Sequence, residues 1–200
     1  MTNFFTLNPL NTKFISRIST IEKRIQKYGN SSSLISDEAK LLAELVKNFE
    51  IEPLEIKEDK IHNEIIEKKS KIRYGDVKEE AMLYSIPFTG DHTLFEYKPK
   101  KHPQYVLKGY IKDNKVFVEI SLGGMITGNL AVQTKIGNDI VIAVNLLKEW
   151  IVEVNKEVEE FNNHLSGVTQ IKITAKIDEL KKIEEAIDNT NPFKKKPTEE

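Results

Sequence analysis

The residue types best suited to catalysis lie at Glu96-Tyr97-Lys98, with Asp91 and Asp76 upstream. Metal-dependent nucleases often hold an Asp and a Glu-x-Lys on adjacent strands, where the carboxylates bind Mg²⁺ and the Lys helps to position the attacking water. Residues two apart on a strand share a face. The same Glu-x-Lys pattern recurs at 55–57 and 67–69 in this chain, which is rich in Glu and Lys. Asp91, Glu96 and Lys98 are therefore candidate catalytic residues, and a solvated strand face is the alternative.

A basic cluster overlaps this stretch. It contains Lys98, Lys100, Lys101 and His102, and the aromatic residues Tyr97 and Tyr105 flank it. Binding of single-stranded nucleic acid requires cations for the phosphates and aromatic faces for the bases. The cluster holds no arginine, and the formal net charge of the chain is −1. Nucleic-acid contact at Lys98, Lys100 and Lys101 is thus a secondary hypothesis.

Apart from this Mg²⁺ hypothesis, no pattern in the sequence predicts a metal site or a cofactor. The four histidines include no pair with the i, i+4 spacing of a helical zinc site, and there is no cysteine. The glycine stretch 123–128 lacks the Lys-Ser/Thr of a phosphate loop. Gly90-Asp91 is typical of a turn that the Asp side chain closes by accepting from nearby backbone N–H groups.

The element that organises the chain is a heptad seam of eight apolar residues with the spacing 4, 3, 4, 3, 4, 3, 4. Its members are Ile140, Val144, Leu147, Ile151, Val154, Val158, Phe161 and Leu165. This pattern predicts a helix over about 138–166, with Asn138 and Asp139 as its cap and first turn. Gly167 would stop it.

The seam has two possible partners. Helices predicted at 14–28 and 173–187 could cover it within one chain, or it could pair with another copy. Trp150 widens the apolar face beyond a two-residue seam, which favours burial on two sides. The residues that we expect to mediate such interactions are Val144, Leu147, Trp150, Ile151, Val154, Val158 and Phe161.

The region 1–75 has a helical pattern. Apolar residues repeat over 14–28, where Gly29 ends the helix, and a second helix is expected to start at Ser36 and to end by Pro53. The polar stretch 30–33 would link the two helices. A third helical segment, carrying Ile61, Ile65 and Ile72, is expected to finish at 74–75.

From about residue 81 the apolar period changes to that of strands. The clearest unit is a hairpin over 105–122 that turns at Asp113-Asn114, with Lys112 opposite Lys115. That register places Ile111 opposite Val116 on one face and an aromatic pair on the other. Further strands are expected at 82–88, 94–98 and 130–136.

These elements predict an α+β fold with a central antiparallel sheet of four to five strands and amphipathic helices from both ends of the chain. Region 1–75 would be helical, and 76–190 would hold the sheet and a long helical hairpin in the same domain. Residues 191–200 would form a mobile tail.

Composition is that of a cytoplasmic protein. Residues 1–10 have no basic start, and the longest purely apolar run, 140–144, is too short to cross a bilayer. The absence of cysteine fits a reducing compartment, and the near-zero net charge gives no overall attraction to nucleic acid or acidic membranes.

One block resembles a known group. Residues 86–91 read Ile-Pro-Phe-Thr-Gly-Asp, Leu94-Phe95 follow, and Trp150, Phe161-Asn162-Asn163 and Leu165 come later. Together they resemble a group of uncharacterised bacterial proteins that is loosely associated with antiviral defence operons. The resemblance spans about 82–166 and implies a bacterial source and a partner-dependent role, without implying any catalytic residue.

The expected function is that of a non-enzymatic assembly or adaptor protein that presents a helical surface to itself or to a protein partner. The resemblance implies a bacterial defence complex as its setting. The alternative is a nucleic-acid-binding or metal-dependent nuclease domain that uses the region around Glu96 and Lys98. A third option is a regulatory domain of a longer effector. We expect no cofactor and no membrane partner.

Overall fold

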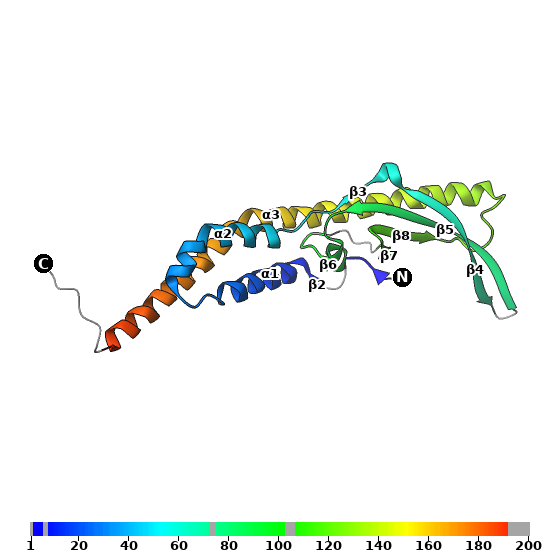
Figure 1. Cartoon of the computed structure of the whole chain (residues 1–200). Helices are drawn as coiled ribbons and strands as arrows, with labels where there is room; N and C mark the ends of the chain where they lie inside the picture. Colours follow the sequence, from blue (N-terminus) through cyan, green and yellow to red (C-terminus); the bar gives the residue numbers. More distant parts are fainter. Residues whose placement is uncertain (1, 6–7, 73–74, 103–106, 192–200) are drawn as a thin grey trace. The chain divides into compact units, whose positions relative to one another are not determined.

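A computed structural model describes residues 2–5, 8–72, 75–102 and 107–191; of residues 2, 69–72 and 75–77 it describes the backbone alone. The fold is α+β, as predicted, with a curled antiparallel sheet and three α-helices (Figure 1). The helices are α1 (Leu10–Ile25), α2 (Ser31–Phe49) and α3 (Leu130–Thr190). Two short 3₁₀ helices, η1 (Glu58–Lys60) and η2 (His92–Glu96), join the strands.

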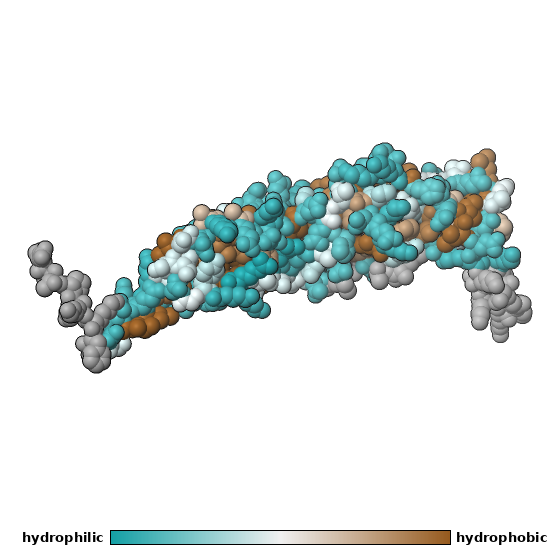
Figure 2. Space-filling model, viewed as in Figure 1, coloured by the Kyte–Doolittle hydropathy of each residue, from teal (hydrophilic) through white to brown (hydrophobic). Residues whose placement is uncertain are grey.

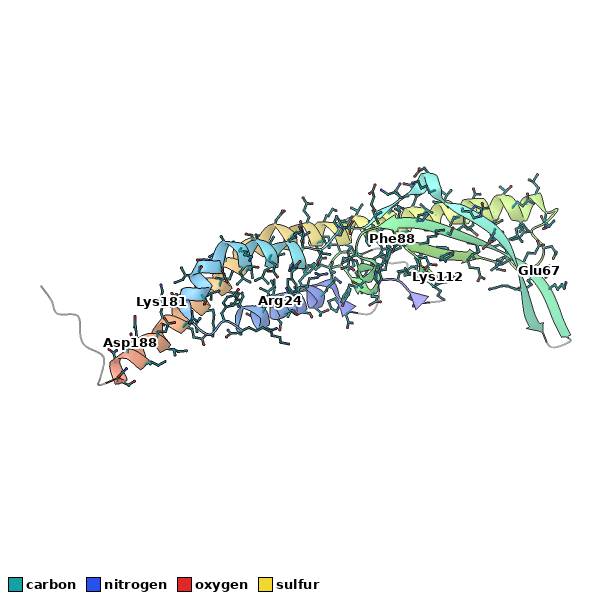
Figure 3. All side chains as sticks on the ribbon, viewed as in Figure 1. Arg24, Glu67, Phe88, Lys112, Lys181 and Asp188 are labelled. Atoms are coloured by element: carbon teal, nitrogen blue, oxygen red, sulfur yellow. The ribbon has the colours of Figure 1, made fainter. Side chains whose placement is uncertain are left out.

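The sheet has the strand order β1-β7-β8-β5-β3, and β4 also pairs with β5. Its strands are β1 (Thr2–Asn3), β3 (Glu55–Ile56), β4 (His62–Ile72), β5 (Gly75–Thr89), β7 (Lys108–Lys112) and β8 (Lys115–Ile120). A separate parallel pair joins β2 (Asn8–Pro9) to β6 (Tyr97–Lys98). Because β8 pairs with β5 only from Met82 to Pro87, the β4–β5 hairpin extends beyond β8, and Glu67 lies on that extension (Figure 3).

The predicted hairpin register is confirmed for the three residue pairs next to the turn. Lys112 lies opposite Lys115, Ile111 opposite Val116, and Tyr110 opposite Phe117. The Tyr110 and Phe117 rings stack with centroids 4.8 Å apart. Asp113 and Asn114 have φ of 51° and 55°, the left-handed values that a two-residue turn of this kind requires. Residues 105 and 106, where the predicted hairpin begins, lie outside the described residues.

The predicted third helix is wrong, because residues 62–72 form β4. Each residue of β4 has a partner on β5, from His62 opposite Ser85 to Ile72 opposite Gly75. The Ile spacing fitted a helix, but pairing with a neighbouring strand outweighs such a weak local preference. Region 1–75 is therefore helical only as far as Phe49, and β3, η1 and β4 follow.

The N-terminal helices are confirmed with different bounds. α1 begins at Leu10, and α2 begins at Ser31, where Asn30 accepts a hydrogen bond from the Ser33 N–H at 2.8 Å. The stretch 30–33, predicted to be a linker, is therefore the cap and first turn of α2.

The long helix exists and is longer at both ends than predicted. The strand expected at 130–136 is instead the start of α3, where the Asn129 side chain accepts from the Val132 N–H at 3.2 Å as an N-cap. Gly167 does not stop the helix: it is absent from the positive-φ glycines, so it lacks the left-handed conformation of a helix C′ residue. The predicted helical hairpin is thus a single helix, and the predicted tail lies outside the described residues except for Asn191.

The chain forms two compact units. Unit 1 comprises residues 1–13 and 51–159, and unit 2 comprises residues 14–50 and 160–200. Both α1 and α3 contribute residues to each unit.

Unit 1 packs its sheet against the first part of α3 around an aromatic cluster. The Phe5 ring stacks on Trp150 with centroids 4.9 Å apart, and Phe95 contacts both Phe5 and Phe88. The Asn155 side-chain amide, on α3, accepts from the Leu54 N–H at 2.9 Å and donates to the Leu54 carbonyl at 2.7 Å. This pair of bonds ties the segment before β3 to the helix.

Unit 2 is a bundle of α1, α2 and α3 segments with an aliphatic core. The core contains Ile21, Ile25, Leu34, Leu41, Leu45, Phe49, Leu165, Ile173, Ile177 and Leu180. The Phe14 ring stacks on Phe161 at 4.6 Å. The Glu184 carboxylate accepts from the backbone N–H and the hydroxyl of Ser31, so it caps the first turn of α2.

Candidate functional site

The seam of α3 is buried within the chain itself. Leu147, Val154 and Val158 are at most 1% exposed, and Phe161 is half-buried. The residues that we expected to meet a partner, Val144, Leu147, Trp150, Ile151, Val154, Val158 and Phe161, therefore all pack inside their own unit. A surface for another molecule must use other residues.

The opposite side of the first part of α3 offers such a surface. There Leu130 is 77% exposed, Val141 58%, Ile142 65% and Val152 51%. We call this the outer face and define it by its exposed residues, Leu130, Thr134, Asn138, Val141, Ile142, Asn145 and Val152. Hydrophobic side chains are visible at the end of unit 1 where α3 begins (Figure 2).

Charge is sparse along this part of the helix. Between residues 130 and 147 the charged side chains are Lys135 and Asp139. One 18-residue window of α3 has the length and apolar composition of a membrane span, and 28% of it is buried in the protein. An exposed stretch with so little charge is unusual on a soluble surface and is typical of a docking surface.

A groove of about 680 Å³ opens on the outer face near its C-terminal end. Its lining on α3 includes Asn145, Glu149 and Val152, and Lys101 and His102 line it from the segment after β6. The His102 ring stacks on Trp150 with centroids 5.4 Å apart, which fixes this edge of the groove to the core of unit 1. Val152 gives the groove an apolar residue among polar ones.

A second groove, of about 310 Å³, shares His102 with the first. Lys98, Lys100 and Glu157 are among its lining residues. The structure thus brings the predicted nucleic-acid residues Lys98, Lys100 and Lys101 together around His102. Carboxylates accompany them, since the Lys100 N–H donates to Glu157 at 2.5 Å. The charge of these grooves is therefore mixed.

Asp91 is held by its neighbours in unit 1. Its carboxylate forms an ion pair with Lys13 at 3.0 Å and accepts from the Thr93 N–H and hydroxyl. The Lys13 and Asp91 side chains are only 11% and 17% exposed. Partial burial acts to raise the pKa of Asp91, but the hydrogen bonds from Thr93 and Lys13 outweigh it and hold the pKa below its usual value. Asp91 closes the turn after Gly90, as predicted.

The three candidate catalytic residues do not form a strand-borne site. The strand predicted at 94–98 is wrong for 94–96, which belong to η2, and only Tyr97–Lys98 forms β6. Glu96 and Lys98 are exposed, but they do not share the face of one strand. Among the described residues, no group of three or more His, Asp or Glu side chains could hold a metal ion. The side chain of Asp76 lies outside the described residues.

Sequence reasoning missed one organised carboxylate, Glu80. Its oxygens accept from the N–H groups of Ile126 and Thr127 at 2.6 and 2.7 Å and from the Thr127 hydroxyl at 3.0 Å. The Thr127 N–H, with these other donors, holds the pKa of Glu80 below its usual value despite burial. Glu80 thereby anchors the glycine-containing loop that leads into α3, and no local sequence signal indicates this.

Comparison with protein-family models, curated proteins and solved structures finds no match for this chain. The outer face and its groove are therefore the features from which a function can be argued.

Proposed function

We propose that this protein is a non-enzymatic assembly protein that docks another protein on the outer face of α3. The observation that carries the proposal is the contrast between the two sides of one helix. The inner side is already covered by unit 1, whereas the outer side exposes Leu130, Val141 and Ile142 with few charges nearby. Full burial of such a side chain contributes roughly 1.5–3 kcal/mol, so a few of them suffice for a specific contact.

The polar residues of the outer face favour a protein partner over lipid. Thr134, Asn138 and Asn145 are interleaved with the apolar side chains, and Asp139 lies in the same stretch. A protein surface can satisfy such groups by hydrogen bonds, whereas a hydrocarbon interior cannot. The resemblance of the 86–95 block supports a cytoplasmic role in a bacterial defence complex as the setting for this docking.

The test is a photo-crosslinking amino acid placed at Ile142. In bacterial cells that contain the natural partners, we expect a defined protein adduct that disappears when Leu130→Asp is added. The same amino acid at Ile187, which is 61% exposed on the unit 2 part of α3, serves as the control. If position 142 gives no adduct, or the same adducts as position 187, the outer face is not a docking surface.

Nucleic-acid binding is the second candidate, because the structure gathers Lys98, Lys100 and Lys101 around two grooves. Under this hypothesis the protein would bind single-stranded DNA or RNA, and binding would weaken steeply with salt. Substituting all three lysines with glutamine should then abolish binding. Binding that is unchanged in this variant, or absent from the wild type, would exclude the grooves as a nucleic-acid surface.

A further inference from the structure

We propose that the occupant of the outer face is a second copy of this chain, bound antiparallel about a two-fold axis that passes between Val141 and Ile142. The inference rests on the proposed function, because it names the partner for the same surface. Two rows of residues along the outer side of α3 carry it, and each row is complementary to itself.

The first row is apolar and consists of Leu130, Val141 and Val152. Its members are 11 residues apart, and 11 residues return to within about 20° of the same direction on an α-helix. A two-fold axis near Val141 exchanges the two ends of the row, so Leu130 of each copy lies opposite Val152 of the other. Val141 then lies opposite its own counterpart.

The second row is charged at its ends and consists of Lys135, Ile142 and Glu149. Its members are seven residues apart, so they also lie within about 20° of each other per step. The same two-fold axis places Lys135 opposite Glu149 of the second copy, and does so twice. Both side chains are exposed, and neither has an ion pair among the described residues.

The groove also allows the two copies to fit together in shape. Leu130 is the most exposed large apolar residue among those described, and Val152 lies in the groove of about 680 Å³. Under the two-fold pairing, the Leu130 side chain of one copy enters the groove of the other at Val152. Lys148 lies in the same row as Val141, where Thr134 of the second copy is nearest, and it already pairs with Glu58 at 2.8 Å.

A parallel arrangement would lack these features. Leu130 would then face Leu130, away from the groove. Lys135 would face Lys135 and Glu149 would face Glu149, which places like charges together. Only the antiparallel arrangement brings Leu130, the most exposed large apolar residue among those described, to the groove and pairs a cation with an anion.

The direct test uses the absence of cysteine from the chain. For helices packed 8–10 Å apart, Cα atoms near the two-fold axis come to about 5–6 Å, within the range of a disulfide. Val141→Cys should therefore form a disulfide-linked dimer almost completely under mild oxidation. Ile187→Cys, also on an exposed part of α3, should give only traces. Equal yields for the two variants would overturn the inference.

The register is tested with mixed variants. Leu130→Cys and Val152→Cys should each crosslink poorly alone, and their mixture should crosslink well. In a parallel pair, each would instead crosslink with itself, and that result would contradict the proposed register.

Charge reversal provides the third arm. Lys135→Glu or Glu149→Lys alone should weaken self-association on the order of fivefold to tenfold, since each creates two like-charge pairs per dimer. The double variant should regain wild-type association. A double variant as weak as the single ones would argue against this pairing.

The docking surface and the second copy as its occupant can be excluded separately. If Val141→Cys does not crosslink but the adduct at position 142 contains a different protein and is lost with Leu130→Asp, the second copy is excluded while the docking surface stands. If position 142 gives no adduct at all, both fail. Flotation of the wild type with lipid vesicles that depends on Leu130 would exclude both in favour of a lipid surface.

Discussion

The two parts of α3 are alike on the inside and different on the outside. In both, an apolar stripe is buried, by the sheet in unit 1 and by α1 and α2 in unit 2. Outside, residues 130–147 carry little charge, whereas Ile187 of unit 2 belongs to a stretch of α3 rich in charged residues, among them Lys181 and Asp188 (Figure 3). Single exposed apolar residues among charges are normal, but an uncharged row of them indicates a docking surface.

The largest expected effect concerns the inner side of α3 in unit 1. Trp150→Ala should cost about 3–5 kcal/mol and Leu147→Ala about 2–5 kcal/mol of unfolding free energy, because both side chains are buried and a cavity remains. Val141→Ala, on the outer face, should change it by less than about 0.5 kcal/mol. Denaturant titration with a constant slope measures all three. Similar losses of unfolding free energy in the Leu147→Ala and Val141→Ala variants would show that the two sides of α3 do not differ in burial.

Two glycines differ in the space around them. Gly90 lies against the backbone of another segment, whereas Gly167 lies on an open surface of α3. Gly90 has φ of +99°, and an added Cβ would lie 2.1 Å from the Pro53 carbonyl oxygen. Gly90→Ala should therefore cost at least about 1–3 kcal/mol from backbone strain alone. Gly167→Ala should stabilise by about 0.5–1 kcal/mol, since nothing lies within 4 Å and the residue is within α3. Opposite signs in thermal unfolding are the expected result.

Glu80, which anchors the loop before α3, should make the stability of the folded state depend on pH. The folded state lowers the pKa of Glu80, so the stabilisation is present above the ordinary glutamate value of 4.5 and is lost as pH falls through the lower, folded pKa. Glu80→Gln keeps one acceptor but no charge. It should lower the melting temperature at pH 7 and reduce the further loss on acidification. A wild-type acid profile in this variant would show that Glu80 does not contribute.

The last prediction concerns the inner side of unit 2. The Thr169 hydroxyl oxygen is buried and has no hydrogen-bond partner in the described part of the chain. Thr169→Val replaces it with a methyl group of similar shape and similar helix propensity, so stability should rise by about 1 kcal/mol. A loss of stability in the same denaturant titration would indicate that the hydroxyl has a partner, such as a bound water.

The sequence predicts those parts of the fold whose signal is local. The α3 seam, the type of the 113–114 turn and the hairpin register all follow from spacing and residue type. β4 could not be predicted, because its Ile spacing also suits a helix and its strand pairing depends on β5. The extent of α3 was missed because Asn138-Asp139 resembles a helix start and Gly167 a helix end in sequence, although all three residues lie within the helix.

The site was harder to predict for a related reason. Periodicity identifies the buried side of α3, and we expected that side to bind a partner before the structure showed that unit 1 covers it. The outer face could be identified only from the structure, which shows that Leu147 and Trp150 are buried and that Val141 and Ile142 are exposed. The gathering of Lys98, Lys100 and Lys101 around His102 was partly predictable from their adjacency.

Sedimentation equilibrium of the wild type and of Val141→Asp tests most directly whether a second copy binds to the outer face. The wild type should approach twice 23.0 kDa with rising concentration, and the variant should stay at 23.0 kDa and still unfold in one cooperative transition. A wild type that remains a monomer at every concentration, or a Val141→Asp variant that unfolds, would contradict it.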